Sequence, residues 1–379
     1  MDNKPFDRSR AWVEIDLNAL EHNLADIKAK TPDTCEIMAV VKANAYGHGV
    51  KIIAEHLVKK GIETFAVATL SEAVQLREHV PEAKILVLGC THPKDVKFLY
   101  ENKLTQLVQD EAYAKVLEDT GYKLSIHIAV DTGMHRLGIE PKDISDIEKI
   151  FACKNLKVEG IATHLASSDS FDKNEIDFTN KQLETFAELI RNLKAKGYDT
   201  GKIHTQSSYG IYNYPDIKND YVRPGIMLYG LQSQNGETKV KTNLRPVLSL
   251  KAIIAQVRWI EAGESVSYSR TYTADKRMKI ATVCIGYADG VPRQASGNGA
   301  EAIVNGVKVP IIGRICMDML ILDVTNASNV EAGDIAVLIG KDGNEEIRCE
   351  DLAESAGTIT NDVLSGLSSR LPRISSERQ

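Results

Sequence analysis

The fold of this chain is decided by the stretch IMAVVKANAYGHG, residues 37–49. Its apolar part, residues 37–41, has the length and the β-branched content of a strand that is covered on both faces. Lys42 follows this run at once, and burial lowers the pKa of a lysine. Lys42 is therefore a candidate imine-forming amine, although a surface lysine at a strand end gives the same local pattern. Gly47 and Gly49 then allow the backbone to turn tightly and to approach a ligand before a helical pattern begins.

Length, composition and charge restrict the class of protein. With 379 residues, of which 43% are hydrophobic and 26% are charged, the chain has room for two globular domains of ~100–200 residues each. A net charge of -6 provides no basic surface for nucleic acid, so no nucleic-acid partner is predicted. The 6 cysteines form no CxxC pair and no metal-ligand spacing, which indicates reduced thiols and no metal site.

No targeting or membrane segment is apparent. The first residues, Met1–Arg10, are polar and charged and lack the apolar core of a signal peptide. No apolar run approaches the ~18 residues of a membrane span. We therefore expect a cytoplasmic protein, or the cytoplasmic catalytic part of a membrane-anchored protein.

Between residues 14 and 245, apolar strand-like runs alternate with amphipathic helical stretches. A strand at residues 11–15 and a helix near residues 18–30 precede this alternation. Eight strands interleaved with helices predict a (β/α)8 barrel, in which sites gather at the C-terminal ends of the strands. The predicted strands cover residues 36–42, 64–69, 84–89, 104–108, 123–130, 157–163, 202–207 and 222–229.

Polar side chains crowd these predicted strand ends. A lysine, two arginines and a histidine in one ring of eight positions would form an electropositive pocket, which suits an anionic ligand. Chance placement gives some polar residues after strands in any barrel, because loops are polar. The residues concerned are Lys42, Asp131, Arg136, His164, Ser207, Ser208 and Arg223 to Gly225.

After about Arg245 the pattern changes to short strands separated by turns that contain Gly, Asn and Asp. We predict a mainly β domain over residues 246–379, which the N-terminal strand, residues 1–13, joins. A helical pattern occurs only at residues 349–367. The predicted strands of this domain cover residues 247–257, 279–285, 301–312, 319–324 and 334–339.

Seven short motifs stand out along both predicted domains. They are AVVKANAYGHG at 39–49, DTGMHRLG at 131–138, THLASSD at 163–169, VRPGIMLYG at 222–230, VSYSRTYTA at 266–274, GYADG at 286–290 and GRICMD at 313–318. In this order the chain resembles the alanine racemase family over essentially its whole length. The resemblance implies a homodimer with shared active sites that uses pyridoxal phosphate to convert L-alanine to D-alanine.

The resemblance also implies how the cofactor is held. Lys42 carries pyridoxal phosphate, while Tyr46, Ser208 and the backbone of Gly225 and Ile226 bind its phosphate. A glycine suits that place, since an exposed N–H meets a phosphate oxygen only where no side chain intervenes.

Arg223 is implied to face the pyridine nitrogen of the cofactor. Because an arginine does not give up its proton, that nitrogen stays unprotonated and the ring is a weaker electron sink. Side reactions such as transamination should therefore be suppressed.

Racemisation needs an acid/base on each face of the substrate. The resemblance implies that Lys42 serves one face and Tyr268, contributed by the β domain of the second subunit, serves the other. A tyrosine with the ordinary pKa of about 10 is a poor base at neutral pH. Tyr268 is implied to be linked to His164, which contacts Arg223, and nearby positive charge lowers a tyrosine pKa.

The substrate carboxylate is implied to be received by Arg136, Tyr287 and the N–H of Met317. Arg136 is also implied to lie near the phenolic oxygen of the cofactor. Many relatives have a lysine at the position of Ala129, whose carbamate fixes this arginine. Because Ala129 has no amine, a chloride, a water or another side chain must hold Arg136 here.

Two further departures concern the substrate. Asn361 stands where alanine racemases usually carry a tyrosine, and QSSYG at 206–210 differs from the more usual Asn-Ser pair. Both features are similar to the racemase domain of the serine racemases found with vancomycin resistance, which carry a membrane domain ahead of the catalytic part. They imply that Asn361 enlarges or polarises the pocket, so that L-serine to D-serine is also plausible. Neutral variation at Asn361 is the competing interpretation.

Other classes stay open at this point. A dedicated serine racemase domain of the vancomycin-resistance type is one alternative. The pathway served is cell-wall (peptidoglycan) precursor synthesis in either its ordinary or its vancomycin-resistant form. Barrel-type pyridoxal-phosphate decarboxylases share the architecture, but the GYADG and GRICMD motifs argue against them. A non-catalytic pyridoxal-phosphate carrier would not need residues 246–379.

Overall fold

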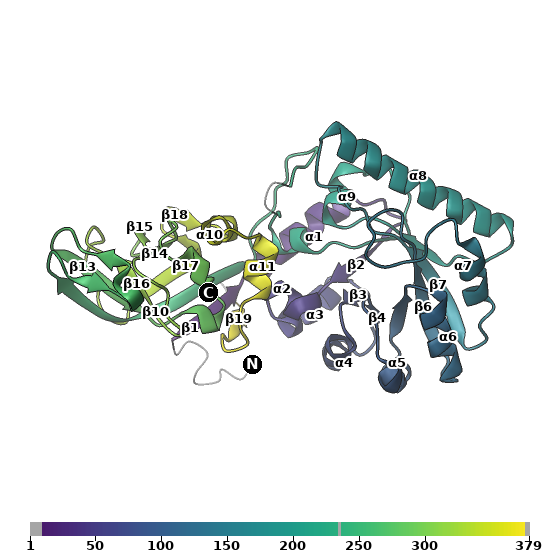
Figure 1. Ribbon diagram of the computed structural model, residues 1–379, viewed down its shortest axis with the longest axis horizontal. Helices are drawn as coiled ribbons and strands as arrows, with labels where there is room; N and C mark the ends of the chain where they lie inside the picture. The colour runs from purple at the N-terminus through teal and green to yellow at the C-terminus, as the bar shows by residue number, and fades with distance from the viewer. Residues whose placement is uncertain (1–9, 234–235, 376–379) are drawn as a thin grey trace.

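The structure, a computed structural model, describes residues 10–233 and 236–375. It contains a barrel and a mainly β domain, which lie at opposite ends of an elongated molecule (Figure 1). The predicted fold class is confirmed. Most of the polar segment Met1–Arg10 and the last residues of the predicted β domain, 376–379, lie outside the described residues.

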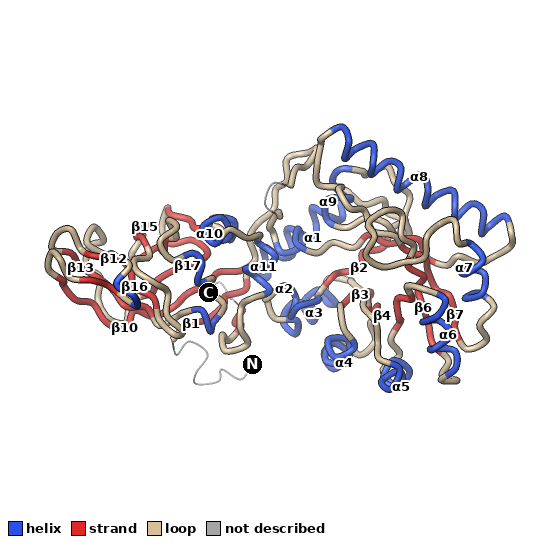
Figure 2. The backbone as a smooth tube through the Cα atoms, in the orientation of Figure 1, coloured by secondary structure: helices blue, strands red, loops and turns tan. Residues whose placement is uncertain are grey.

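The barrel is built from eight parallel strands (Figure 2). Neighbouring strands follow the chain order from β2 to β8, and β9 pairs with β2. A parallel bridge between Ser207 and Arg223 joins the ends of β8 and β9, which completes the ring. The strands are β2 (Glu36–Val40), β3 (Thr64–Val67), β4 (Lys84–Val87), β5 (Thr105–Val108), β6 (Leu124–Ala129), β7 (Leu156–Ala162), β8 (Lys202–His204) and β9 (Tyr221–Val222).

Helices cover the outside of the barrel. Their apolar faces are buried against the strands, as in α3, where Ile53, Ala54 and Leu57 are buried. The covering helices are α1 (Leu17–Ala29), α3 (Val50–Lys59), α4 (Leu70–His79), α5 (Val96–Glu101), α6 (Glu111–Asp119), α7 (Ile144–Phe151) and α8 (Lys173–Ala195). Two short segments, α2 (Lys42–Tyr46) and α9 (Ser208–Asn213), follow β2 and β8 and line a cavity instead.

The eighth strand is shorter than predicted. We expected residues 222–229, but β9 ends at Val222 and a 3-10 helix occupies Ile226–Tyr229. Pro224 has no N–H to donate to a neighbouring strand, so the ladder cannot continue through it. The prediction was wrong because the apolar run after Pro224 also suits a buried helical turn.

The β domain is organised around its longest strand, β10 (Leu248–Ile260), which pairs with β1, β13 and β17. The N-terminal strand β1 (Ala11–Ile15) lies in this sheet, antiparallel to β10 and parallel to β19. The remaining strands are β11 (Ser265–Val266), β12 (Tyr272–Thr273), β13 (Met278–Val283), β14 (Glu301–Val304), β15 (Val307–Pro310), β16 (Leu320–Asp323), β17 (Ile335–Asp342), β18 (Glu345–Ile347) and β19 (Arg373–Ser375).

Two predicted runs of this domain are divided. Residues 301–312 form the hairpin β14–β15, because Asn305 and Gly306 both adopt positive φ and make a tight turn. The helical pattern at 349–367 is split into α10 (Cys349–Ala356) and α11 (Thr360–Ser365).

The two domains meet at the end of the barrel where the strands finish. Helix α11 lies beside α2 (Figure 1), and a side chain at Gly47 would collide with the carbonyl of Leu364. Arg373 of β19 donates from Nε to the carbonyl of Gly47 at 3.0 Å. The lysine-bearing turn is therefore held between the domains. No helix within the described ranges is long and apolar enough to cross a membrane.

Candidate active site

Lys42 begins an unusual turn. The next four residues, Ala43 to Tyr46, have φ between 51° and 54°, and Gly47 has φ 78°. This left-handed conformation costs roughly 1–2 kcal/mol for each residue with a side chain, and such strain clusters at functional sites. Burial and the charge of Arg136 lower the pKa of Lys42, whereas the carboxylate of Glu72 opposes this shift. A lowered pKa favours the neutral, nucleophilic amine.

A cradle of polar groups lies beside the lysine. The hydroxyl of Ser208 accepts a hydrogen bond from the N–H of Gly225 at 2.9 Å and from the N–H of Met227 at 3.4 Å. A Cβ at Gly225 would lie 2.6 Å from the phenolic oxygen of Tyr46, so only glycine leaves this space open. Converging N–H and hydroxyl groups of this kind suit a phosphate.

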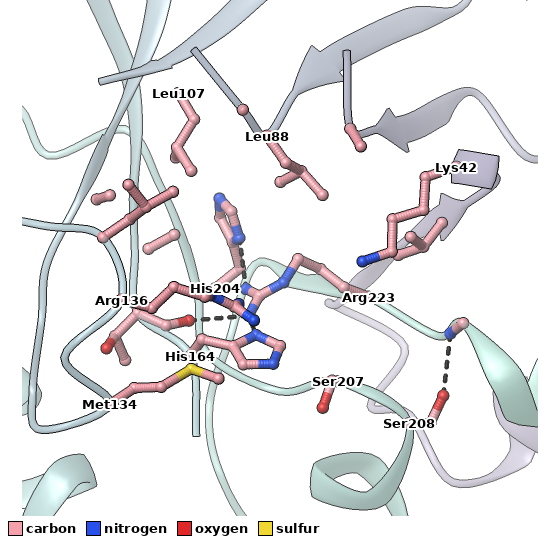
Figure 3. A pocket seen from close by; sticks show the side chains of 18 of the residues that line it. Lys42, Leu88, Leu107, Met134, Arg136, His164, His204, Ser207, Ser208 and Arg223 are labelled. Carbon is pink, nitrogen blue, oxygen red and sulfur yellow. Dashed lines mark hydrogen bonds between the residues drawn. The ribbon is translucent and has the colours of Figure 1, made fainter. Parts of the chain in front are cut away.

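Arg223 is buried at the centre of the site (Figure 3). Its Nη2 donates to the carbonyls of Thr163 at 2.8 Å and Thr205 at 2.9 Å, and lies 3.3 Å from Nδ1 of His164. Burial and the charge of Arg136 lower the pKa of Arg223 to about 10. The guanidinium therefore stays charged at neutral pH and acts only as a donor.

Two histidines inside the barrel continue from Arg223. Nη1 of Arg223 lies 2.6 Å from Nδ1 of His204, and Nε2 of His204 lies 2.8 Å from Nδ1 of His127. Because arginine donates, Nδ1 of His204 accepts, its proton is on Nε2, and that N–H donates to His127. Burial lowers the pKa of His127 to about 4 and that of His204 well below its ordinary value. Both rings are therefore neutral, and the chain fixes their tautomers.

The lysine, the polar cradle and Arg223 line one cavity of about 480 Å³ at the strand ends. Desolvation and the charges of Arg223 and Arg136 lower the pKa of His164 to about 3, so its ring is neutral. The predicted electropositive ring is thus brought together in one place. The candidate residues that line the cavity are Lys42, Tyr46, Arg136, His164, Ser207, Ser208, Arg223, Gly225, Ile226 and Asn361.

Arg136 has an exposed position and lies on the loop after β6. Within residues 10–233 and 236–375, no hydrogen bond or ion pair engages its guanidinium. Ala129 is buried and lines the same cavity. No side chain of the described chain therefore takes the place of the lysine that many relatives have at this position.

Three predicted site residues do not line the cavity of their own chain. Tyr268, Tyr287 and Met317 lie on the β domain with exposed fractions of 69%, 39% and 53%. Their loops are tied together: Tyr287 donates its N–H to the carbonyl of Cys316 at 3.0 Å, and Ser267 donates its hydroxyl to the carbonyl of Arg314 at 2.6 Å. These side chains lie exposed on the β domain.

Asn361, at the start of α11, lines the cavity from the β domain of the same chain. Its Oδ1 accepts a hydrogen bond from the hydroxyl of Ser233 at 3.2 Å and a weaker one from Thr360 at 3.5 Å. The amide nitrogen of Asn361 makes no hydrogen bond to any described residue. A donor is therefore free to meet a ligand oxygen.

Three contributors were missed from the sequence. His127 and His204 occur inside apolar strands. A histidine at a position that faces the barrel interior is the signal that could have indicated them. Glu72 was hidden in one of the amphipathic helical stretches between the predicted strands, although Thr69 and Glu72 form a capping-box pattern. Their contacts with the site join residues far apart in the chain, which local patterns do not reveal.

The fold and the cavity define a two-domain enzyme class whose barrel carries a lysine beside an anion-binding cradle. Family models agree: residues 15–233 match the alanine racemase N-terminal domain and residues 247–375 match the alanine racemase C-terminal domain. The chain belongs to the alanine racemase family.

Named relatives extend this finding. An amino-acid racemase of Enterococcus faecalis is 43% identical over 96% of this chain and 51% of its own length. A serine/alanine racemase of Enterococcus gallinarum is 39% identical, again over 96% of this chain and 51% of its own. The chain thus spans about half the length of these relatives. An alanine racemase of Carboxydothermus hydrogenoformans is 39% identical over 96% of this chain and 98% of its own.

A solved structure is similar in fold. The alanine racemase of Bartonella henselae with covalently bound pyridoxal phosphate superposes with a TM-score of 0.82 at 32% identity. The match covers 97% of this chain and 99% of that chain.

Proposed function

We propose that this chain is a pyridoxal-phosphate-dependent racemase of small amino acids, with L-alanine as substrate and L-serine as a second one. One observation carries the proposal: Lys42, the cradle of Ser208 and Gly225, and the donor Arg223 line one cavity. The N–H of Gly225 and the hydroxyls of Ser208 and Tyr46 lie close together and fit a phosphate, and the amine of Lys42 fits an aldehyde. The bound cofactor of the Bartonella henselae relative supports the same assignment.

When bound, pyridoxal phosphate supplies an electron-withdrawing ring that acidifies the Cα–H of an amino acid. The chain supplies the rest. Arg223 would face the ring nitrogen as a donor that does not give up its proton, which would limit side reactions. Arg136, an exposed cation at the cavity wall, receives an anionic oxygen. Lys42, held at the cavity edge with a lowered pKa, moves a proton at Cα on one face.

The opposite face needs a second acid/base, and we assign it to Tyr268 of a second subunit. The exposure of Tyr268 and its absence from the cavity of its own chain support this arrangement. Tyr287 and the N–H of Met317 lie on the same exposed surface and would complete the carboxylate site of the partner. The proposed unit of function is a homodimer with shared sites. We also propose that residues 14–245 form the barrel and residues 246–379, with strand residues 1–13, form the β domain.

The substrate range follows from Asn361. Its amide leaves space where a tyrosine would fill the cavity, and its free donor can meet a substrate hydroxyl. The name of the Enterococcus gallinarum relative, serine/alanine racemase, supports activity on both amino acids. A change of pocket space by about one methylene alters discrimination between substrates by about 10- to 200-fold.

The test measures formation of the D-enantiomer from L-alanine and L-serine on one cofactor-loaded preparation, together with release of carbon dioxide. We expect racemisation of both substrates and no carbon dioxide. Asn361→Tyr should lower serine turnover relative to alanine by about tenfold. An unchanged ratio contradicts the role of Asn361, and carbon dioxide without racemisation contradicts the proposed reaction in favour of a decarboxylase.

A further inference from the structure

The lysine-bearing turn needs an external support. Four consecutive residues with side chains, Ala43 to Tyr46, adopt the left-handed conformation that only glycine favours. Backbone bonds close the turn internally, from the N–H of Ala45 to Val41 and from Gly47 to Ala43. These bonds do not fix the direction in which the turn leaves β2. A group outside the turn must do so.

Arg373 holds the end of the turn at Gly47, and the carboxylate of Glu72 holds its start. Its Oε1 accepts the N–H of Ala43, the residue after Lys42, at 2.7 Å. Its Oε2 accepts the N–H groups of Ala68 and Thr69 at 2.8 Å and 3.1 Å, just before α4. One carboxylate therefore joins the start of the left-handed turn to the start of the neighbouring helix.

An ordinary helix cap does not account for this geometry. In a capping box the glutamate bonds back only to the N-cap backbone, and here Oε2 and Thr69 perform that role. Oε1 of Glu72 takes no part in the helix cap and instead accepts the N–H of Ala43 in α2. Bonds to an ionised acceptor are roughly twice as strong as neutral ones. The second oxygen therefore acts on the lysine turn.

We propose that Glu72 is a positioning residue, which clamps the left-handed turn to α4 and thereby directs the side chain of Lys42 into the cavity. The inference rests on the proposed function, in which Lys42 forms the bond to the cofactor. Glu72 does not contact the cavity, since it is absent from its lining. Its negative charge also opposes the effects of burial and of Arg136 on Lys42, so the two residues communicate through charge as well as backbone.

Two variants separate the elements of this role. Glu72→Asp keeps the charge but is one methylene shorter, so it reaches Ala68 and Thr69 or Ala43, but not both. Glu72→Gln keeps the length but has one acceptor oxygen for three N–H groups and no charge. The matched control is Glu78→Gln. Glu78 lies on the exposed side of the same helix, and its side chain makes no hydrogen bond or ion pair within the described ranges.

The experiment uses the pyridoxal-phosphate-loaded protein. Borohydride reduction followed by peptide mapping gives the fraction of cofactor attached to Lys42. The visible absorbance of the attached cofactor gives the rate at which hydroxylamine releases it. Thermal unfolding gives the stability of each variant. We expect both Glu72 variants to release the cofactor about tenfold faster, the factor of one charge-assisted hydrogen bond. Their melting temperatures should stay near that of the wild type, and Glu78→Gln should match the wild type in every measurement.

The outcomes are distinct. Release rates equal to the wild type in both Glu72 variants overturn the inference. So does faster release in proportion to a lowered melting temperature, because that indicates a helix cap alone. If borohydride attaches no cofactor to Lys42 in the wild type, the proposed function itself fails and this inference fails with it.

Discussion

Removal of the carboxylate of Asp289 should destabilise the β domain and loosen its substrate loop. The side chain is fully buried, with no exposed surface. Both oxygens accept bonds from the guanidinium of Arg10, and one also accepts the N–H of Gly286 at 3.1 Å. A second cation, Arg370, lies 3.6 Å away. Asp289 thus joins Arg10, which precedes β1, to the turn that carries Tyr287.

The magnitude follows from burial. Loss of one partner from a buried ion pair costs about 3–5 kcal/mol. Since the side chain of Arg10 is 31% exposed and water can solvate it, the lower end, ~3 kcal/mol, applies to Asp289→Ala. This corresponds to a fall of roughly 6–12 °C in the melting temperature of a domain of this size. Circular dichroism during thermal unfolding measures it.

The chain provides a matched control. Asp318 also pairs with Arg370, at 2.6 Å, but its side chain is 50% exposed. Exposed pairs contribute about 0–1 kcal/mol, so Asp318→Asn should change the melting temperature by less than about 4 °C. Equal losses in the two variants, or a melting temperature of Asp289→Ala within about 2 °C of the wild type, would refute the argument from burial.

Three other outcomes are expected. Burial lowers the pKa of His127 in the folded state to about 4, so below about pH 6.5 the unfolded chain binds more protons than the folded chain. The free energy of unfolding should therefore fall as the pH is lowered from about 6.5 toward 4. In denaturant titrations, His127→Gln should flatten this slope by about 1.4 kcal/mol per pH unit. Gly225→Ala should weaken pyridoxal phosphate roughly tenfold in a cofactor titration, because the new Cβ overpacks Tyr46 by about 1–3 kcal/mol; unchanged affinity would contradict the cradle. Lys42→Ala and Tyr268→Phe, each inactive alone, should regain activity at about a quarter of the sites when mixed and reassembled; no recovery would contradict shared sites.

Much of the barrel could be predicted because its strands are apolar runs that end at polar residues. Val40 to Lys42 and Ala162 to His164 show such ends clearly, and parallel strands must bring them to one edge. The residues of the electropositive ring could therefore be placed together before any contact was known. β9 was predicted wrongly because hydrophobicity alone does not distinguish a buried strand from the buried 3-10 turn after Pro224.

The remaining features depend on contacts that no local pattern contains. Ala43 and Ala45 have no preference for a left-handed turn, so their conformation depends on packing against α11 and on the contact with Glu72. The bond between His127 and His204 joins residues 77 positions apart. Sequence motifs indicated which residues matter, whereas the way in which they support one another required the folded chain.

The contacts between Arg223, His204 and His127 fix which ring nitrogens carry protons at the site. If His204 were free to rotate, its Nε2 or Nδ1 could face Arg223, and a ring N–H there would oppose the guanidinium. Arg223 prevents this, because its Nη1 only donates and therefore requires the lone pair on Nδ1 of His204, which leaves the Nε2 proton of His204 for Nδ1 of His127. Both rings stay neutral in the barrel interior. Arg223 is consequently held as a charged donor at a depth where a second cation would be costly, and a ligand that reaches it must offer an acceptor.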